Sequence, residues 1–179
     1  MSLTALPGSP ERKQESRNAR KVLRLLEVKL TSLGFQRTKP TVFTRRGQYV
    51  VEFVHVHKFT FGPSFRVHFG VRVRTDDFPA NHLNGPASDA IADPESPGRR
   101  LYRFEFTPNE VSWESCAEAM HQCVRTDGLR WFASVTDPVT LLSPGSPLTP
   151  NAKAALKREL EQPSSVQVSA ATLRVLNAA

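Results

Sequence analysis

The segment from Ser64 to Arg74 constrains the fold more than any other part of the chain, because apolar and polar residues alternate along it without interruption. Side chains on a β-strand point alternately to opposite faces of the sheet. One set is wholly apolar (Phe65, Val67, Phe69, Val71 and Val73), and the other is mainly basic (Arg66, His68, Gly70, Arg72 and Arg74). Such alternation predicts an antiparallel strand with one face on the core and the other in water.

Neighbouring segments supply the rest of an antiparallel meander. Residues 41–46 predict a short strand, and the Val- and Phe-rich residues 49–59 predict a long one after a tight turn. Residues 75–99 are rich in Pro, Asn, Asp and Ser and predict a long loop. Alternation resumes at 101–106, so the sequence predicts a four-stranded, mostly antiparallel meander sheet.

Two main helices are predicted to cover one face of that sheet. The first spans 9–33, where apolar residues recur at three- and four-residue steps, with Ser9 as the N-cap and Gly34 as a left-handed C-cap. The second begins near Thr107 and buries the apolar residues around Trp113. The predicted fold class is therefore α+β.

The chain is expected to divide into a core domain and a C-terminal extension. An α+β core domain is predicted at 1–142, and a linker with a helical tail at 143–179. Within the tail, the pattern predicts helices at 149–161 and 168–176, and both are too short to be stable alone.

Cysteine usage and the absence of long apolar segments indicate the compartment. Cys116 and Cys123 share one face of a predicted helix but lie about 10 Å apart along it, too far for a disulfide. They are expected to be reduced core residues. The N-terminus lacks the apolar stretch of a signal peptide, and no window approaches the ~18 apolar residues of a membrane span. We expect a cytoplasmic protein with no membrane contact.

The charge balance is basic, with 24 Lys and Arg against 17 Asp and Glu and a net charge of +7 over 179 residues. A basic balance favours anionic partners, although an inert basic surface is the alternative. Four cations, Lys13, Arg17, Arg20 and Arg24, recur at steps of three and four on the first helix. Such a ridge can contact phosphates, which makes nucleic-acid binding an alternative function. The other interpretation is a solvated helix face shared with nearby glutamates.

A second basic surface is predicted on the wet face of the sheet. It consists of Arg66, His68, Arg72 and Arg74. We found no nucleophile elbow, phosphate-binding loop, dinucleotide-binding glycine motif or H-E-x-x-H sequence. The leading prediction is therefore a non-catalytic protein without a cofactor, which binds another protein through these four residues as an immunity or accessory factor.

Two histidines on one strand raise a metal site as a further alternative. His55 and His57 point to the same side of their strand, and His68 lies on the next strand. If Phe59 pairs with Phe65, His55 and His57 face the core and His68 faces water, so that no metal site forms. A shift of one residue would unite the three histidines. A metal-assisted hydrolase that uses His55 and His57 stays as the third hypothesis.

Three segments carry a resemblance to a known family. They are LTSLGFQRTKPTVFTRRGQYVVEFVHVHK at 30–58, FRVHFGVRV at 65–73 and RWFASVTDPVTLL at 130–142. Together they resemble the bacterial family called domain of unknown function 4304 over about residues 20–142. The chain departs from the usual family pattern at Val54 and His55. The resemblance implies an α+β fold without assigned chemistry, and similar small bacterial domains include immunity proteins that block a toxin.

Overall fold

A five-stranded antiparallel sheet lies at the centre of the computed structural model, which describes residues 8–60, 62–90, 104–162 and 167–177. Its strands follow the chain order: β1 (Gln36–Lys39), β2 (Val42–Arg46), β3 (Val50–Lys58), β4 (Ser64–Val73) and β5 (Phe104–Glu105). The predicted meander is confirmed, but the prediction of four strands is wrong. The additional strand, β1, consists only of polar residues, so it carries no apolar alternation by which the sequence could reveal it. Of the strand predicted at 101–106, the first three residues lie outside the described part of the chain.

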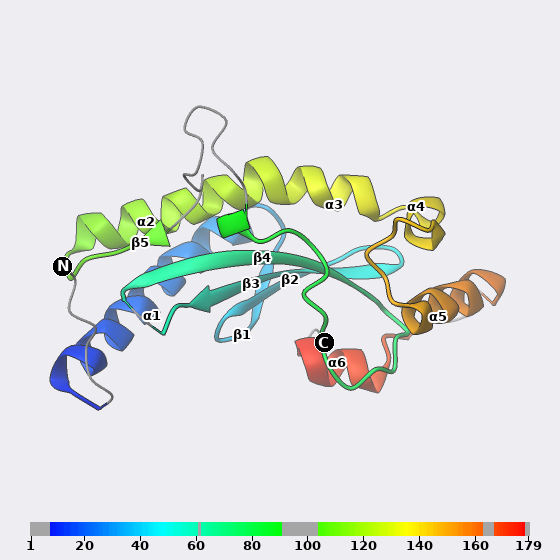
Figure 1. Cartoon of the computed structure of the whole chain (residues 1–179), viewed down its shortest axis with the longest axis horizontal. Coiled ribbons are helices and arrows are strands. Elements are labelled where there is room, and N and C mark those ends of the chain that lie inside the picture. The colour runs from blue at the N-terminus through cyan, green and yellow to red at the C-terminus, as the bar shows by residue number, and fades with distance from the viewer. Residues whose placement is uncertain (1–7, 61, 91–103, 163–166, 178–179) are drawn as a thin grey trace.

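Six α-helices surround this sheet in the described residues (Figure 1). They are α1 (Pro10–Thr31), α2 (Glu110–Cys123), α3 (Leu129–Val135), α4 (Pro138–Leu142), α5 (Pro150–Glu161) and α6 (Ala170–Leu176). A π-helical turn at Val124–Gly128 joins α2 to α3, so the two follow one another along one side of the sheet in Figure 1. A short 3-10 turn, η1 (Ser88–Ala90), lies in the predicted long loop.

One face of the sheet forms the main core, as the alternation in β4 predicts. The apolar side chains of β4 pack with those of α1, α2, α3 and α5 in one cluster of buried residues. On α1, Val22, Leu26 and Leu30 are fully buried. The helix begins where Ser9 accepts a hydrogen bond from the N–H of Arg12, at 3.2 Å, and it is followed by Gly34 at φ +82°. The predicted N-cap is therefore confirmed, whereas the C-cap is Ser32 and Gly34, with its left-handed conformation, lies two residues beyond it.

The opposite face carries a second, smaller core that the sequence did not reveal. Val51 and Phe53 of β3 pack there with Leu176 of α6, and all three are fully buried. Gly70 of β4 leaves the space for Phe53, because a Cβ atom at this position would meet the Phe53 ring at 2.1 Å. The C-terminal helix therefore covers part of the face that was expected to lie in water.

The C-terminal extension packs on the same body as the core domain. Ala152, Ala155 and Leu156 of α5 belong to the main core cluster. Thr172 of α6 is fully buried and donates to the backbone oxygen of Asp76 at 3.1 Å. The helices predicted at 149–161 and 168–176 are confirmed, and tertiary packing stabilises both. No helix in the described ranges has the length and apolar character needed to cross a bilayer.

Candidate functional site

The cationic stripe on α1, formed by Lys13, Arg17, Arg20 and Arg24, is exposed along its whole length. Its members lie on the side of the helix away from the buried residues Val22 and Leu26. At 1.5 Å per residue, the stripe is about 16 Å long. Within the described residues, no salt bridge engages any of its four side chains. The structure therefore brings together all four residues that the nucleic-acid alternative named.

The glutamates of the same helix do not neutralise this stripe. Glu15 makes ion pairs with Lys58 of β3 and, at 3.1 Å, with Arg12. Glu27 pairs with Arg37 of β1 at 3.0 Å. Two of the three glutamates of α1 are thus engaged elsewhere, which weakens the interpretation of the stripe as an ordinary mixed-charge surface.

The third glutamate, Glu11, lies in the first turn of α1. Hydrogen bonds from its own backbone N–H and from Ser9 hold the pKa of its carboxyl below the usual range. Its negative charge therefore lies at the helix N-terminus, where backbone N–H groups favour an anion.

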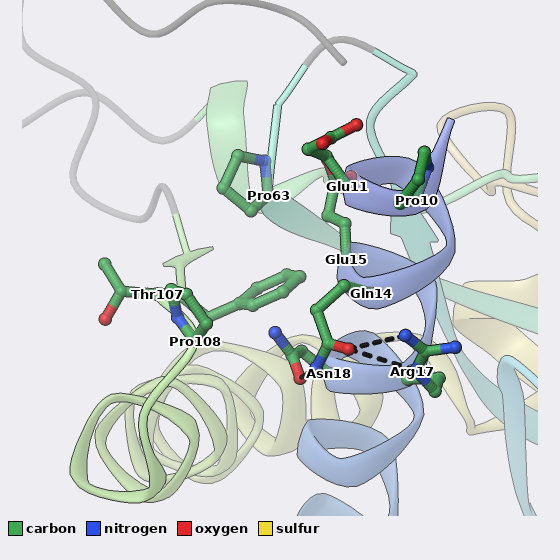
Figure 2. Close-up of a pocket in the computed structure, with 10 residues that line it drawn as sticks. Pro10, Glu11, Gln14, Glu15, Arg17, Asn18, Pro63, Thr107 and Pro108 are labelled. Carbon is green, nitrogen blue, oxygen red and sulfur yellow. Dashed lines mark hydrogen bonds between the residues drawn. The ribbon is translucent and has the colours of Figure 1, made fainter. Parts of the chain in front are cut away.

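Arg17 is the member of the stripe with a defined side-chain contact. Its Nε and Nη2 donate to Oε1 of Gln14 at 3.1 and 2.6 Å, as the dashed lines in Figure 2 show. Gln14 in turn donates to Oδ1 of the buried Asn18 at 3.0 Å. This chain of hydrogen bonds orients the guanidinium along the helix surface without neutralising its charge.

Of the four residues predicted to form a basic surface on the sheet, Arg72 departs most from the prediction, because it is 3% exposed. Its guanidinium donates to Oγ1 of Thr172 at 2.6 Å and to the backbone oxygens of Asp76, Phe78 and Ala80 at 2.9, 2.6 and 2.6 Å. The prediction that Arg72 lies in water is therefore wrong. It is buried because α6 and the segment after β4 close over it.

The other three residues of that predicted surface lie in different surroundings. Arg74 donates to the backbone oxygen of Gln48 at 2.8 Å, beside the turn between β2 and β3. Arg66 pairs with Asp89 of η1 at 3.3 Å. His68 is half-buried and forms a β-bridge with Ala87. Only Arg66 and His68 remain close to each other on the uncovered part of the sheet.

The β3–β4 register differs by one residue from the predicted one. Lys58, not Phe59, pairs with Phe65, so His55 lies opposite His68 and His57 opposite Arg66. The stretch Val50–His57 is apolar on both faces, and a period of two therefore could not fix the pairing. As a consequence, His55, His57 and His68 all project from the face opposite the main core.

These three imidazoles form a half-buried cluster. The His55 ring centroid lies 6.3 Å from that of His57 and 6.3 Å from that of His68. Burial, followed by the charges of neighbouring groups, lowers the pKa of His55 and of His68. With the rings as they stand, no three His, Cys, Asp or Glu side chains in the described part of the chain are arranged to hold a metal ion.

A cavity of about 550 Å³ opens between the first turns of α1 and the segment that leads into α2. Figure 2 shows Pro63 and Pro108 across from the side of α1 that carries Glu15 and Asn18. The buried ring of Phe106 also lines it. Sequence reasoning missed this cavity, because its walls come from three segments that no local pattern connects.

The two cysteines offer no reactive thiol. Both are free and buried, as the sequence predicted. Burial raises the pKa of the Cys116 thiol to about 12 and raises that of Cys123 further. Because the thiolate is the reactive form, neither group suits nucleophilic chemistry at neutral pH.

In comparisons with known proteins, no family model, no curated protein and no solved structure matches this chain. The resemblance to domain of unknown function 4304 therefore stays a prediction. The functional inference rests on the residues and surfaces of the chain itself.

Proposed function

We propose that this protein is a non-catalytic binding protein that contacts the phosphate backbone of nucleic acid through the cationic stripe on α1. The observation that carries the proposal is the exposure of Lys13, Arg17, Arg20 and Arg24 in one line, with Glu15 and Glu27 paired elsewhere. The net charge of +7 adds a long-range attraction for polyanions.

The geometry suits a backbone contact better than a base-specific one. A line of cations about 16 Å long spans several phosphates of a duplex, which carries one charge per about 1.7 Å of axis. The helix itself is held firmly from below, since Lys29 pairs with Glu118 of α2 at 2.5 Å and the ammonium of Lys21 lies 4.1 Å from the centre of the Trp113 ring. These contacts help to fix the helix backbone that carries the four cations.

The non-catalytic part of the proposal is supported by the chemistry of the described side chains. Cys116 and Cys123 are buried thiols with raised pKa values. Along the cavity at the start of α1, Gln14 bonds to Asn18 and Glu15 pairs with Lys58, so these polar groups satisfy one another. These paired groups therefore offer no free acid and base for catalysis.

A charge-neutralising variant tests the proposal. Arg20→Gln removes one cation from the middle of the stripe, and it is expected to weaken binding to a fluorescein-labelled 20-base-pair DNA duplex in low salt. Arg158→Gln on α5 is the matched control, because it removes the same charge from an exposed helix outside the stripe. Equal loss of affinity in both variants would show a non-specific charge effect, and no loss in Arg20→Gln would place the contact elsewhere.

A protein partner is the second candidate, and the uncovered part of the outer sheet face favours it. There the guanidinium of Arg66 lies 5.4 Å from the centre of the Phe59 ring, and the His57 ring meets Phe59 edge-on at 5.9 Å. Arginine and aromatic side chains are enriched at the centres of protein interfaces. An immunity or accessory role through Arg66 and His68 fits this smaller surface.

One experiment distinguishes the two candidate functions: capture of the protein with its bound partners from the native host. A stoichiometric protein that stays bound after nuclease treatment, and is lost from an Arg66→Glu variant, would support the protein partner. Nucleic acid that is lost on nuclease treatment, and also from the Arg20→Gln variant, would support the first proposal.

A further inference from the structure

The histidine cluster is built on two neighbouring strands of the sheet. His55 and His57 alternate on β3, so both side chains project to the same side of the sheet. His68 lies directly opposite His55 on β4. Two histidines at positions i and i+2 and a third across the ladder therefore share one face of the sheet.

We propose that His55, His57 and His68 together bind one divalent transition-metal ion of the zinc, nickel or copper type. Neutral imidazole nitrogen is a preferred ligand for these ions. Three protein ligands with an open fourth position are sufficient for a mononuclear site.

Side-chain rotation is needed to form the site. The ring centroids lie 6.3 Å apart for both the His55–His57 and the His55–His68 pairs. Each nitrogen has to approach the ion to about 2.0–2.1 Å, so the rings must turn inward from these positions. All three side chains are half-buried, and the β3–β4 ladder fixes their three backbone positions.

Two of the ring nitrogens lack any other use in the described part of the protein. Nδ1 of His55 and Nε2 of His68 are buried and make no hydrogen bond there. An unpaired buried polar atom is costly, and an ion would satisfy both nitrogens.

The cation beside the cluster, Arg66, has a carboxylate partner of its own. Arg66 lies opposite His57, but its guanidinium pairs with the carboxylate of Asp89 at 3.3 Å. The cluster lies on the face of the sheet opposite the main core that packs on α1. The metal proposal is therefore independent of nucleic-acid binding by the stripe.

The chain provides its own controls, because it contains five histidines and only three belong to the cluster. His121 on α2 lies 3.5 Å from Glu118 and has the same ring type beside a potential second ligand. His82 stacks on Phe78 in the loop after β4. Alanine at His121 or at His82 removes one imidazole without touching the cluster.

The test is calorimetric titration of the full chain, without a polyhistidine tag, with Zn²⁺ or Ni²⁺ alone. We expect one ion per chain and an increase of the melting temperature on binding. Loss of an outer-shell partner alone costs about 10- to 100-fold in metal affinity, so His55→Ala, His57→Ala or His68→Ala should each cost at least about tenfold. His121→Ala and His82→Ala should leave the affinity unchanged.

Three results would overturn the proposal. They are the absence of one-to-one binding, equal losses in the cluster and control variants, and unchanged affinity in the cluster variants. Because His55 is partly buried, its variant can lose stability on its own account. His57→Asn, at a more peripheral position, and an unfolding curve for each apo variant distinguish the loss of a ligand from the loss of the fold.

Discussion

His55 lies directly opposite His68 in the β3–β4 ladder, and this pairing defines the two faces of the whole hairpin. It places Val54 and Val56 in the main core. It also turns Phe53 to the other face, where α6 covers it. A register one residue away would reverse every one of these positions.

The contact between Phe53 and Gly70 predicts a strong effect of a single methyl group. In Gly70→Ala the new Cβ would lie 2.1 Å from Cζ of the Phe53 ring, so the ring or the strand must move. We expect the free energy of unfolding to fall by about 1–3 kcal/mol, the range for overpacking of a core. Urea denaturation of the variant and the wild type measures this difference in the free energy of unfolding. Gly145→Ala is the control, since its added Cβ meets nothing within 4 Å, and a similar loss there would contradict the explanation.

The buried Arg72 predicts a structural rather than an interface role for this residue. Arg72→Met retains apolar bulk but leaves Oγ1 of Thr172 and the backbone oxygens of Phe78 and Ala80 without their donor. Removal of one partner from such a buried group is expected to cost about 3 kcal/mol or more. Arg130→Met, on the exposed side of α3, is expected to change stability by less than about 0.5 kcal/mol. If both variants unfold at the same urea concentration, Arg72 does not stabilise the fold.

Replacing the carboxyl of Glu159 on α5 is expected to raise the free energy of unfolding by an amount that depends on pH. Burial raises the pKa of its carboxyl in the folded protein, against smaller lowering effects of a hydrogen bond from Thr75 and the charge of Arg74. In the unfolded chain this carboxyl has a pKa of about 4.3. As the pH rises through that value, the carboxyl ionises in the unfolded chain before it does so in the folded protein, and the folded state therefore loses stability. The loss is complete above the folded pKa.

Glu159→Gln is therefore expected to be more stable than the wild type at pH 7, and the difference should disappear in acid below both pKa values. Thermal unfolding across this pH range checks the prediction. Glu161→Gln, an exposed position on the same helix, should show no such pH-dependent gain. A Glu159→Gln protein that is less stable at pH 7 would mean that the Thr75 and Arg74 contacts outweigh the burial of the charge.

The buried thiols predict a protein resistant to alkylation. Burial raises the pKa of Cys116 to about 12 and raises that of Cys123 as well. Iodoacetamide at pH 8 should therefore modify neither residue in the native state and both in urea, as counted by intact mass. Rapid modification of the native protein would show that α2 opens on the timescale of the reaction.

The sequence predicted those parts of the fold where one face is apolar and the other polar. The strand β4 and the helix α1 have such patterns, and both lie where they were expected. The strand β1 at Gln36–Lys39 was missed because it is polar on both faces and shows no such pattern. The β3 register could not be predicted either, because Val51 and Phe53 are apolar on a face that α6, far along the chain, helps to bury.

The candidate sites show the same division between local and long-range information. A spacing of three and four residues on one helix was enough to predict the cationic stripe, and the structure exposes all four of its members. The surroundings of Arg72 were not predictable, because its partners Thr172 and Ala80 lie 100 and eight residues away. The histidine cluster depended on a register shift of one residue, which no local pattern determines.

The most direct test of the central claim is the salt dependence of DNA binding by the wild-type protein. Four phosphate contacts should release counterions with a slope of about −3.6 in log Kobs against log salt, a loss of about 150-fold between 50 and 200 mM. Arg20→Gln should reduce that slope by about one, whereas Arg158→Gln should leave it unchanged. A flat salt dependence, or a slope that Arg20→Gln does not alter, would contradict nucleic-acid binding through α1.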